Sequence, residues 1–306
     1  MAHITADNAR KDTDLILSKL EKRLTKHYKR AESEIIAKAR KYFESFRKND
    51  ERKRELLERG KISEEEYKTW RKNKILYSKR FIDLKEKISA ELANVNETAL
   101  RYINGEIPEI YVINYNGLGV VIEDEVIGRF DSGYSFDLVD ADTVRILAAE
   151  NPDLLPQKRL DIPKDKAWNK KKMSAEVLQG IIQGESIPKI AARMQSVTEM
   201  NKDSAIRNAR TMVTSAENRG RVESMARAEK DGVILKKEWI SSDQPGRTRD
   251  WHLPGAFESL VVPLDEPFRN EMGEIMYPGD PSASGANVYN CRCSMGTEIV
   301  GFKRSE

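Results

Sequence analysis

The sequence is poor in several residue types, and each shortage excludes a class of protein. Only two of the 306 residues are cysteines, Cys291 and Cys293, and they lie one residue apart. This excludes the disulfide framework of a small secreted protein and favours a reducing compartment. No stretch approaches the roughly 20 apolar residues that span a bilayer, and the N-terminus has no apolar run of signal-peptide length. We therefore expect no contact with a membrane.

Charge is abundant and unevenly distributed. Charged residues make up 34% of the chain and hydrophobic residues only 39%, which is typical of long solvated helices and, at this length, of two domains. Residues 1–105 carry 27 Lys+Arg against 18 Asp+Glu, a net charge of +9, and residues 106–306 carry 26 against 32, a net charge of −6. A basic arm indicates contact with nucleic acid or an acidic protein surface. On charge alone, a solvated helical face is the favoured interpretation.

The first 105 residues show helical periodicity. Apolar residues recur at steps of three and four from Asp12 to Arg59, which predicts one long helix, with a break near 48–50 as an option. Ser63 and Glu66 form a capping box for a second helix that runs to Gly105. Two amphipathic helices joined by a short loop predict an antiparallel hairpin. Its apolar stripe is either the core of the arm or a seam for a partner, and as partner-binding residues we select Leu17, Leu20, Leu24, Ile35, Tyr67, Trp70 and Phe81.

After residue 105 the periodicity of the apolar residues changes. Ile110–Ile113 is a β-branched and aromatic run, and Asn116-Gly117 is a hairpin turn signal before a second apolar run, so residues 106–140 predict a small β-meander. A short helix is expected at 141–150 and a loop at 153–172. We therefore divide the chain into a helical hairpin arm (1–105), a β-meander with a linker (106–163) and a C-terminal domain (164–306). The fold class is α+β.

The C-terminal domain begins with helices. Ser174 is the predicted cap of a helix that Gly184 ends, and Ser186 begins another. Asp203 is the predicted cap of a long helix with a small-sided stripe that ends at Gly232. A strand is expected at 233–240.

The segment 239–295 contains both cysteines and more than half of the prolines, so it predicts a precisely turned, mostly non-helical structure. His252, Cys291 and Cys293 are the candidate metal ligands, because thiolate and imidazole bind zinc. Asp250 or Asp280 could add a fourth ligand. A structural zinc site usually has four ligands and C-x₂₋₄-C spacing, so the sequence favours ordinary packing over zinc, and we expect no cofactor. A cysteine nucleophile with His252 as its base is a further alternative.

These residues also carry a resemblance. The segment resembles the Mu F-like phage head morphogenesis family, the minor head proteins of tailed double-stranded DNA phages, over about residues 165–300. The residues that carry it are Trp239, Arg249, His252, Gly255, Phe268, Gly273, Tyr277, Pro278, Gly279, Asp280, Asn290, Cys291, Arg292 and Cys293.

The resemblance implies a structural role. Such a protein is a low-copy component of the virion, assembled in the host cytoplasm and located inside the phage head. Its partners would be the portal protein, and further the scaffold or major capsid protein and double-stranded DNA. It would act in head morphogenesis and in DNA packaging or delivery. No catalytic residue is carried over. Two other readings remain: a zinc- or cysteine-dependent hydrolase or transferase that uses His252, Cys291 and Cys293, and a DNA-binding accessory protein that uses the basic arm.

Overall fold

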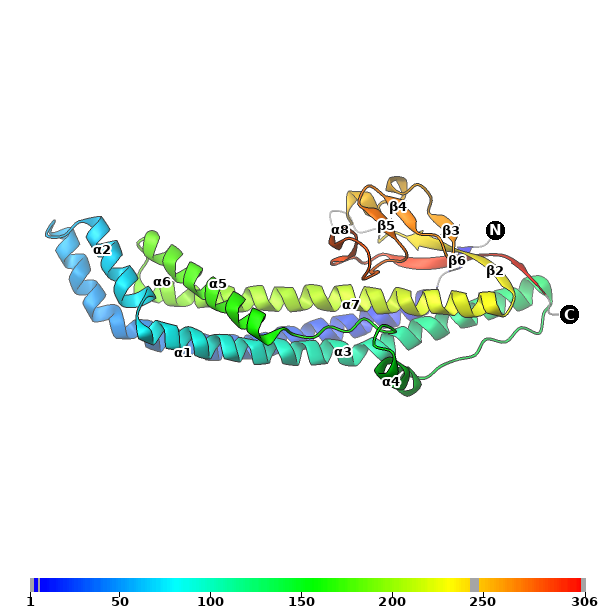
Figure 1. Ribbon diagram of the computed structural model, residues 1–306, viewed down its shortest axis with the longest axis horizontal. Coiled ribbons are helices and arrows are strands. Elements are labelled where there is room, and N and C mark those ends of the chain that lie inside the picture. Colours follow the sequence, from blue (N-terminus) through cyan, green and yellow to red (C-terminus); the bar gives the residue numbers. More distant parts are fainter. Residues whose placement is uncertain (1–2, 5, 243–247, 304–306) are drawn as a thin grey trace. The chain divides into compact units, whose positions relative to one another are not determined.

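The computed structural model describes residues 3–4, 6–242 and 248–303, and helices dominate it (Figure 1). None of the described helices is long and apolar enough to cross a membrane. Together with the antiparallel sheets described next, the helices confirm the α+β class. Their bounds are α1 (Asp7–Glu58), α2 (Glu64–Arg71), a π-helix (Lys72–Leu76), α3 (Lys79–Phe130), α4 (Ala141–Glu150), α5 (Ile162–Ile182), α6 (Ile187–Ala192) and α7 (Met194–Lys230).

The described strands form two antiparallel sheets. The larger sheet has the order β1-β6-β2-β3, with β1 (His3–Ile4), β2 (Val233–Ile240), β3 (Val261–Pro263) and β6 (Ser294–Phe302). The register of its two long strands pairs Trp239 with Met295. The smaller sheet pairs β4 (Phe268–Asn270) with β5 (Gly273–Ile275). Two 3-10 turns (Asp250–His252 and Pro254–Ala256) and α8 (Gly285–Val288) complete this part.

The chain forms two compact units built from segments distant in the sequence. The sheet unit consists of residues 1–21, 102–158 and 206–306, and the helical unit of residues 22–101 and 159–205. Helices α1, α3 and α7 each contribute to both units. This division does not follow the boundaries predicted at residues 105 and 163. An independently folding arm at 1–105 stays a prediction.

The helical unit has an apolar core made by helices that are distant in the sequence. Side chains of α1 and α3, such as Phe43 and Phe81, share one buried cluster with side chains of α5, α6 and the start of α7, such as Val177 and Ile190. Asp50 and Arg71 form a buried ion pair between α1 and α2, with Nε–Oδ1 at 2.7 Å. Helix α1 continues through residues 48–50 without the break that the sequence offered as an option. The predicted capping box of Ser63 and Glu66 is confirmed.

The predicted β-meander at 106–140 is wrong, because α3 continues through Gly105 and Pro108 to Phe130. Its buried residues recur at helical spacing and not at the strand period of two. The glycines that suggested turns allow close packing instead: a Cβ at Gly117 would lie 2.7 Å from the Cβ of Ala9 on α1. The β-branched run 110–113 is therefore helical, since tertiary packing overrides its local preference. The buried positions of this stretch are Ile103, Ile107, Ile110, Tyr111, Val112, Asn114, Tyr115, Leu118, Ile122 and Val126.

Two further helix starts also differ from the prediction, whereas the ends agree. Helix α5 begins after Asp161, whose side chain accepts a hydrogen bond from the Lys164 amide, so residues 162–172 are helical and Ser174 is interior. Helix α7 begins at Met194, so Asp203 is interior as well. Gly184 and Gly232, at φ +65° and +96°, end the preceding helices as predicted. The expected helix at 141–150 and the expected strand at 233–240 are confirmed.

Candidate functional site

An aromatic cluster underlies the turned segment. Trp239, on β2, is buried, and its ring centroid lies 4.7 Å from that of Phe257 and 5.4 Å from that of Phe268. The imidazole of His252 meets the same indole edge-on, at 5.2 Å. Such edge-on and tilted contacts are the favoured arrangements of aromatic rings. Trp239 and Phe268 thus form the apolar floor of this part of the sheet unit.

His252, Cys291 and Cys293 form one buried group, which we call the Cys–His cluster. Nδ1 of His252 lies 3.5 Å from Sγ of Cys291 and 3.7 Å from Sγ of Cys293. All three residues are at most 3% exposed, and their three ligand-type atoms lie within 4.8 Å of one another. Both cysteines are free thiols. The cluster joins the 3-10 turn at 250–252 to the extended segment that leads into β6.

Neighbouring amides fix the orientation of His252. Oδ1 of Asn270 accepts a hydrogen bond from the Met272 amide, which identifies Nδ2 of Asn270 as the donor group. This Nδ2 donates to the Trp251 carbonyl at 3.0 Å and to Oδ1 of Asn287 at 3.1 Å. Oδ1 of Asn287 therefore faces Nε2 of His252, at 3.3 Å. Because an amide oxygen only accepts, Nε2 carries the proton. In the neutral ring, Nδ1 is then the unprotonated nitrogen, and both sulfurs lie within 3.7 Å of it.

The two thiols differ in acidity. The hydrogen bond from Cys291 lowers the pKa of the Cys293 thiol to about 5, although burial opposes the shift. The same contact with Cys293, reinforced by burial, raises the pKa of the Cys291 thiol. Hydrogen bonds that favour the charged form lower a pKa, and those that favour the neutral form raise it. Cys293 is therefore the first of the two to become a thiolate.

A small pocket of about 50 Å³ adjoins the Cys–His cluster. Arg249 closes one side of it and donates a hydrogen bond from its guanidinium to the Tyr289 carbonyl. The structure therefore brings together six of the predicted motif residues. The lining residues are Ser242, Thr248, Arg249, His252, Asn290, Cys291, Arg292 and Cys293.

The remaining motif residues shape turns. Asp280 accepts backbone hydrogen bonds from Met276 and Ser282, at 3.1 and 2.9 Å, and so closes the turn at 277–280. Gly279, at φ +84°, lies against α7, where an added Cβ would come within 2.7 Å of the Ser215 backbone nitrogen. Gly273, at φ +102°, forms the β4–β5 turn. Among the described residues, neither Asp250 nor Asp280 joins the Cys–His cluster as a fourth ligand.

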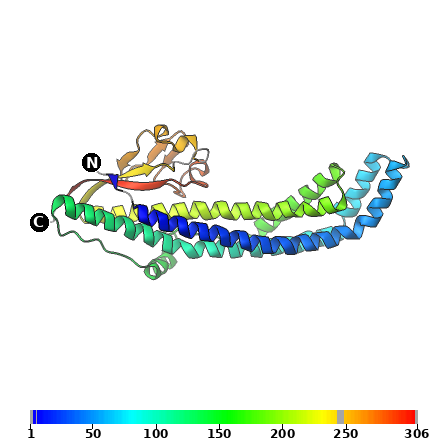
Figure 2. The same ribbon diagram turned by 180° about the vertical axis from the view of Figure 1, so that it is seen from behind.

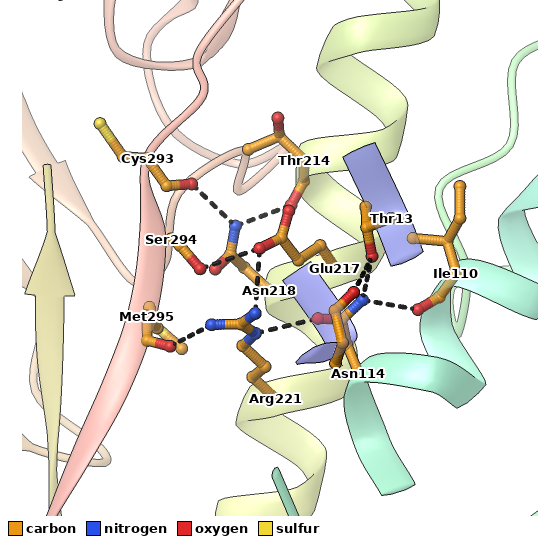
Figure 3. A network of polar contacts seen from close by, with 11 residues as sticks. Thr13, Ile110, Asn114, Thr214, Glu217, Asn218, Arg221, Cys293, Ser294 and Met295 are labelled. Atoms are coloured by element: carbon orange, nitrogen blue, oxygen red, sulfur yellow. Dashed lines mark hydrogen bonds and ion pairs between the residues drawn. The ribbon is translucent and has the colours of Figure 1, made fainter. Parts of the chain in front are cut away.

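A buried polar network joins α7 to the strand that follows the cysteines (Figure 3). Thr214 donates to the Cys291 carbonyl at 2.7 Å, and Asn218 donates to the Cys293 carbonyl at 3.3 Å. The backbone of both cysteines is thus held on α7, whereas the sulfur of Cys293 points away from that helix in Figure 3. The cysteine sulfurs are therefore left for the Cys–His cluster.

Arg221 is the centre of this network. Its side chain is buried, and it donates to the Met295 carbonyl at 2.6 Å and to Oδ1 of Asn114 on α3 at 3.0 Å. Its NH2 group pairs with Glu217 at 3.2 Å, and Ser294 donates to the same carboxylate at 2.8 Å. Sequence reasoning missed Asn114, Thr214 and Arg221. For the residues on α7, the signal in the sequence is a set of polar residues that recur at helical spacing beside the small-sided stripe. A helix face exposed to solvent shows the same pattern, so the signal is not specific.

The predicted partner-binding residues are mostly unavailable. Five of these residues are buried, with exposed fractions of 4% or less, and Leu17 and Trp70 remain partly exposed. For the helical unit the core cluster gives the reason, because α5, α6 and α7 cover the stripe that two helices alone would leave open. The stripe is therefore core and not a free seam. The buried residues are Leu20, Leu24, Ile35, Tyr67 and Phe81.

Comparisons with known proteins agree with the motif. Residues 171–296 match the family described as Phage Mu protein F like protein. The minor head protein GP7 of Bacillus phage SPP1 is 26% identical over 282 residues, which cover 92% of this chain and 83% of that protein. No solved structure gives a significant match. These findings confirm the resemblance to the Mu F-like minor head proteins of phages that the motif residues predicted.

Proposed function

We propose that this minor head protein is a low-copy component located inside the head, and that it binds the portal protein through its helical unit. In this role it acts in head morphogenesis and in the packaging or delivery of DNA. The role is structural rather than catalytic. The observation that carries the proposal is the separation of charge between the two units, with a pocket of apolar and cationic side chains on the basic one.

The charge separation is sharper between the units than along the sequence. The helical unit has 33 Lys+Arg against 20 Asp+Glu, a net charge of +13, and the sheet unit has 20 against 30, a net charge of −10. A strongly basic body attracts an acidic surface and increases the rate of its encounter with that surface. This supports an acidic protein partner for the helical unit.

A pocket on the helical unit offers an anchor point. It has a volume of about 400 Å³, and we call it the basic pocket. Apolar side chains of α1 and α2 lie beside cationic ones, an arrangement suited to an apolar side chain flanked by carboxylates. Aromatic and cationic residues of this kind dominate the energetics of protein interfaces. The lining residues are Phe46, Asn49, Arg52, Lys53, Leu56, Trp70 and Lys74.

The proposal is tested by capturing the portal protein with the full chain. Reversing three charges of the basic pocket (Arg52→Glu, Lys53→Glu and Lys74→Glu) should lower the affinity at least ~10-fold, as loss of an interface hot spot does. The matched control changes the net charge equally on exposed positions of α1, with Lys22→Glu, Lys26→Glu and Lys29→Glu. The control should weaken binding less, and its effect should disappear at high salt.

Equal effects of the two triple variants would contradict a docking role for the basic pocket. A chain that does not capture portal, but binds duplex DNA with an affinity that falls steeply as salt rises, would replace portal binding with the DNA-binding alternative.

A further inference from the structure

We propose that the Cys–His cluster is a zinc site, with Nδ1 of His252 and the sulfurs of Cys291 and Cys293 as its three protein ligands among the described residues. The first argument is distance. A tetrahedral zinc ion, with Zn–N of about 2.0–2.1 Å and Zn–S of about 2.3 Å, separates a nitrogen from a sulfur ligand by about 3.6 Å. The structure places Nδ1 of His252 at 3.5 and 3.7 Å from the two sulfurs.

The second argument is the orientation of the imidazole. Nε2 of His252 is committed to Oδ1 of Asn287, and Asn270 fixes that amide in turn. Metal-bound histidines in general donate their other ring N–H to such an acceptor, which sets the tautomer and the ring angle. This leaves Nδ1, the unprotonated nitrogen, on the side of the two sulfurs.

The third argument concerns the sulfurs. A single lone pair on Nδ1 can accept a hydrogen bond from only one thiol, yet both sulfurs lie at nearly the same distance from it. The Cys293 amide also donates toward Sγ of Cys291, at 3.4 Å, a contact that favours a thiolate. A zinc ion would contact Nδ1 and both sulfurs at once, which accounts for the two similar distances.

Hydrogen bonds already hold the backbone of the two cysteines in position. Thr214 and Asn218 of α7 hold the carbonyls of Cys291 and Cys293, so the sulfurs are free to face His252. The adjoining pocket of about 50 Å³ leaves space for a fourth ligand such as water, which occupies about 30 Å³ in the liquid. The ion would join two segments 39 residues apart and hold the turned segment in place. Its role is therefore to stabilise the Mu F-like domain.

The test uses the full chain, reduced and without a polyhistidine tag. After incubation with zinc and removal of the excess, elemental analysis should find about one zinc per chain. Cobalt(II) in place of zinc should give a thiolate-to-cobalt charge-transfer band and the visible bands of a tetrahedral site. A chelator should lower the melting temperature of the zinc-loaded chain, because binding to the folded state alone stabilises it.

Matched variants assign the ligands. Cys291→Ser with Cys293→Ser, or His252→Ala, should abolish zinc binding, and Asn287→Ala should weaken it about 10- to 100-fold, as loss of a group behind a ligand does. His27→Gln is the control, since His27 bonds the Val95 carbonyl in the helical unit, and it should leave zinc binding unchanged. A reduced native chain with neither stoichiometric zinc nor a cobalt–thiolate band would overturn the proposal. Because the zinc and cobalt measurements are made on the native chain, they do not depend on whether any variant folds.

Discussion

The buried guanidinium of Arg221 should be one of the most sensitive single positions in the sheet unit. Replacing it by methionine keeps most of the apolar stem but removes the ion pair with Glu217 and the hydrogen bonds to Asn114 and the Met295 carbonyl. Breaking a buried pair by removing one partner costs ~3–5 kcal/mol, because the other charge stays buried without compensation. The Glu217 side chain is 11% exposed and keeps its bond from Ser294, which places the expected loss near the lower end of that range.

Two further variants separate charge from geometry. Arg221→Lys keeps the charge, but one ammonium cannot reproduce the planar fork that reaches both Asn114 and the Met295 carbonyl, so its cost should be intermediate. Adding Glu217→Gln to Arg221→Met removes the stranded carboxylate. The double variant should therefore be at least ~1 kcal/mol more stable than the sum of the single changes predicts.

Hydrogen–deuterium exchange read by mass spectrometry resolves this change by region. Arg221→Met should speed exchange about 100-fold in peptides from 206–230 and 294–302, since each 1.4 kcal/mol is a factor of about ten. Peptides from 79–101, in the helical unit, serve as the internal control. Exchange within about threefold of the native chain at 206–230 would refute the reasoning.

Two other positions give independent checks. Gly279→Ala should destabilise the sheet unit by roughly 2–4 kcal/mol in chemical denaturation, because φ is +84° and the new Cβ would meet the Ser215 backbone, whereas Gly255→Ala, in open space, should be nearly neutral. Burial lowers the pKa of the Lys237 ammonium from 10.5 to about 8. Between these two values the unfolded chain binds up to one more proton than the folded chain, so the free energy of unfolding should rise with pH there. A Lys237→Met chain that keeps the same slope from about pH 8 to 10 would contradict this origin.

Helix α1 and the start of α2 could be predicted because their signals are local, whereas the single second helix expected up to Gly105 is divided into α2, the π-helix and α3. The periodic stripe of α1 and the capping box of Ser63 and Glu66 depend on residues within a few positions of each other. The same local reasoning failed at 106–130. There the β-branched run and Asn116-Gly117 favoured strands, and packing of Gly117 against Ala9 about a hundred residues earlier decided for a helix.

The amino-acid sequence by itself determined the α+β class, the turned Gly/Pro segment and the Mu F-like motif, because residue type and short spacing carry those signals. It could not determine that the apolar stripe of α1 is core, since the helices that cover it come from residues 162–205. Nor could it show that His252 presents Nδ1 to both sulfurs, because Asn270 and Asn287 set that orientation from other turns. These features depend on contacts between residues tens to more than a hundred positions apart, which only the tertiary structure brings together.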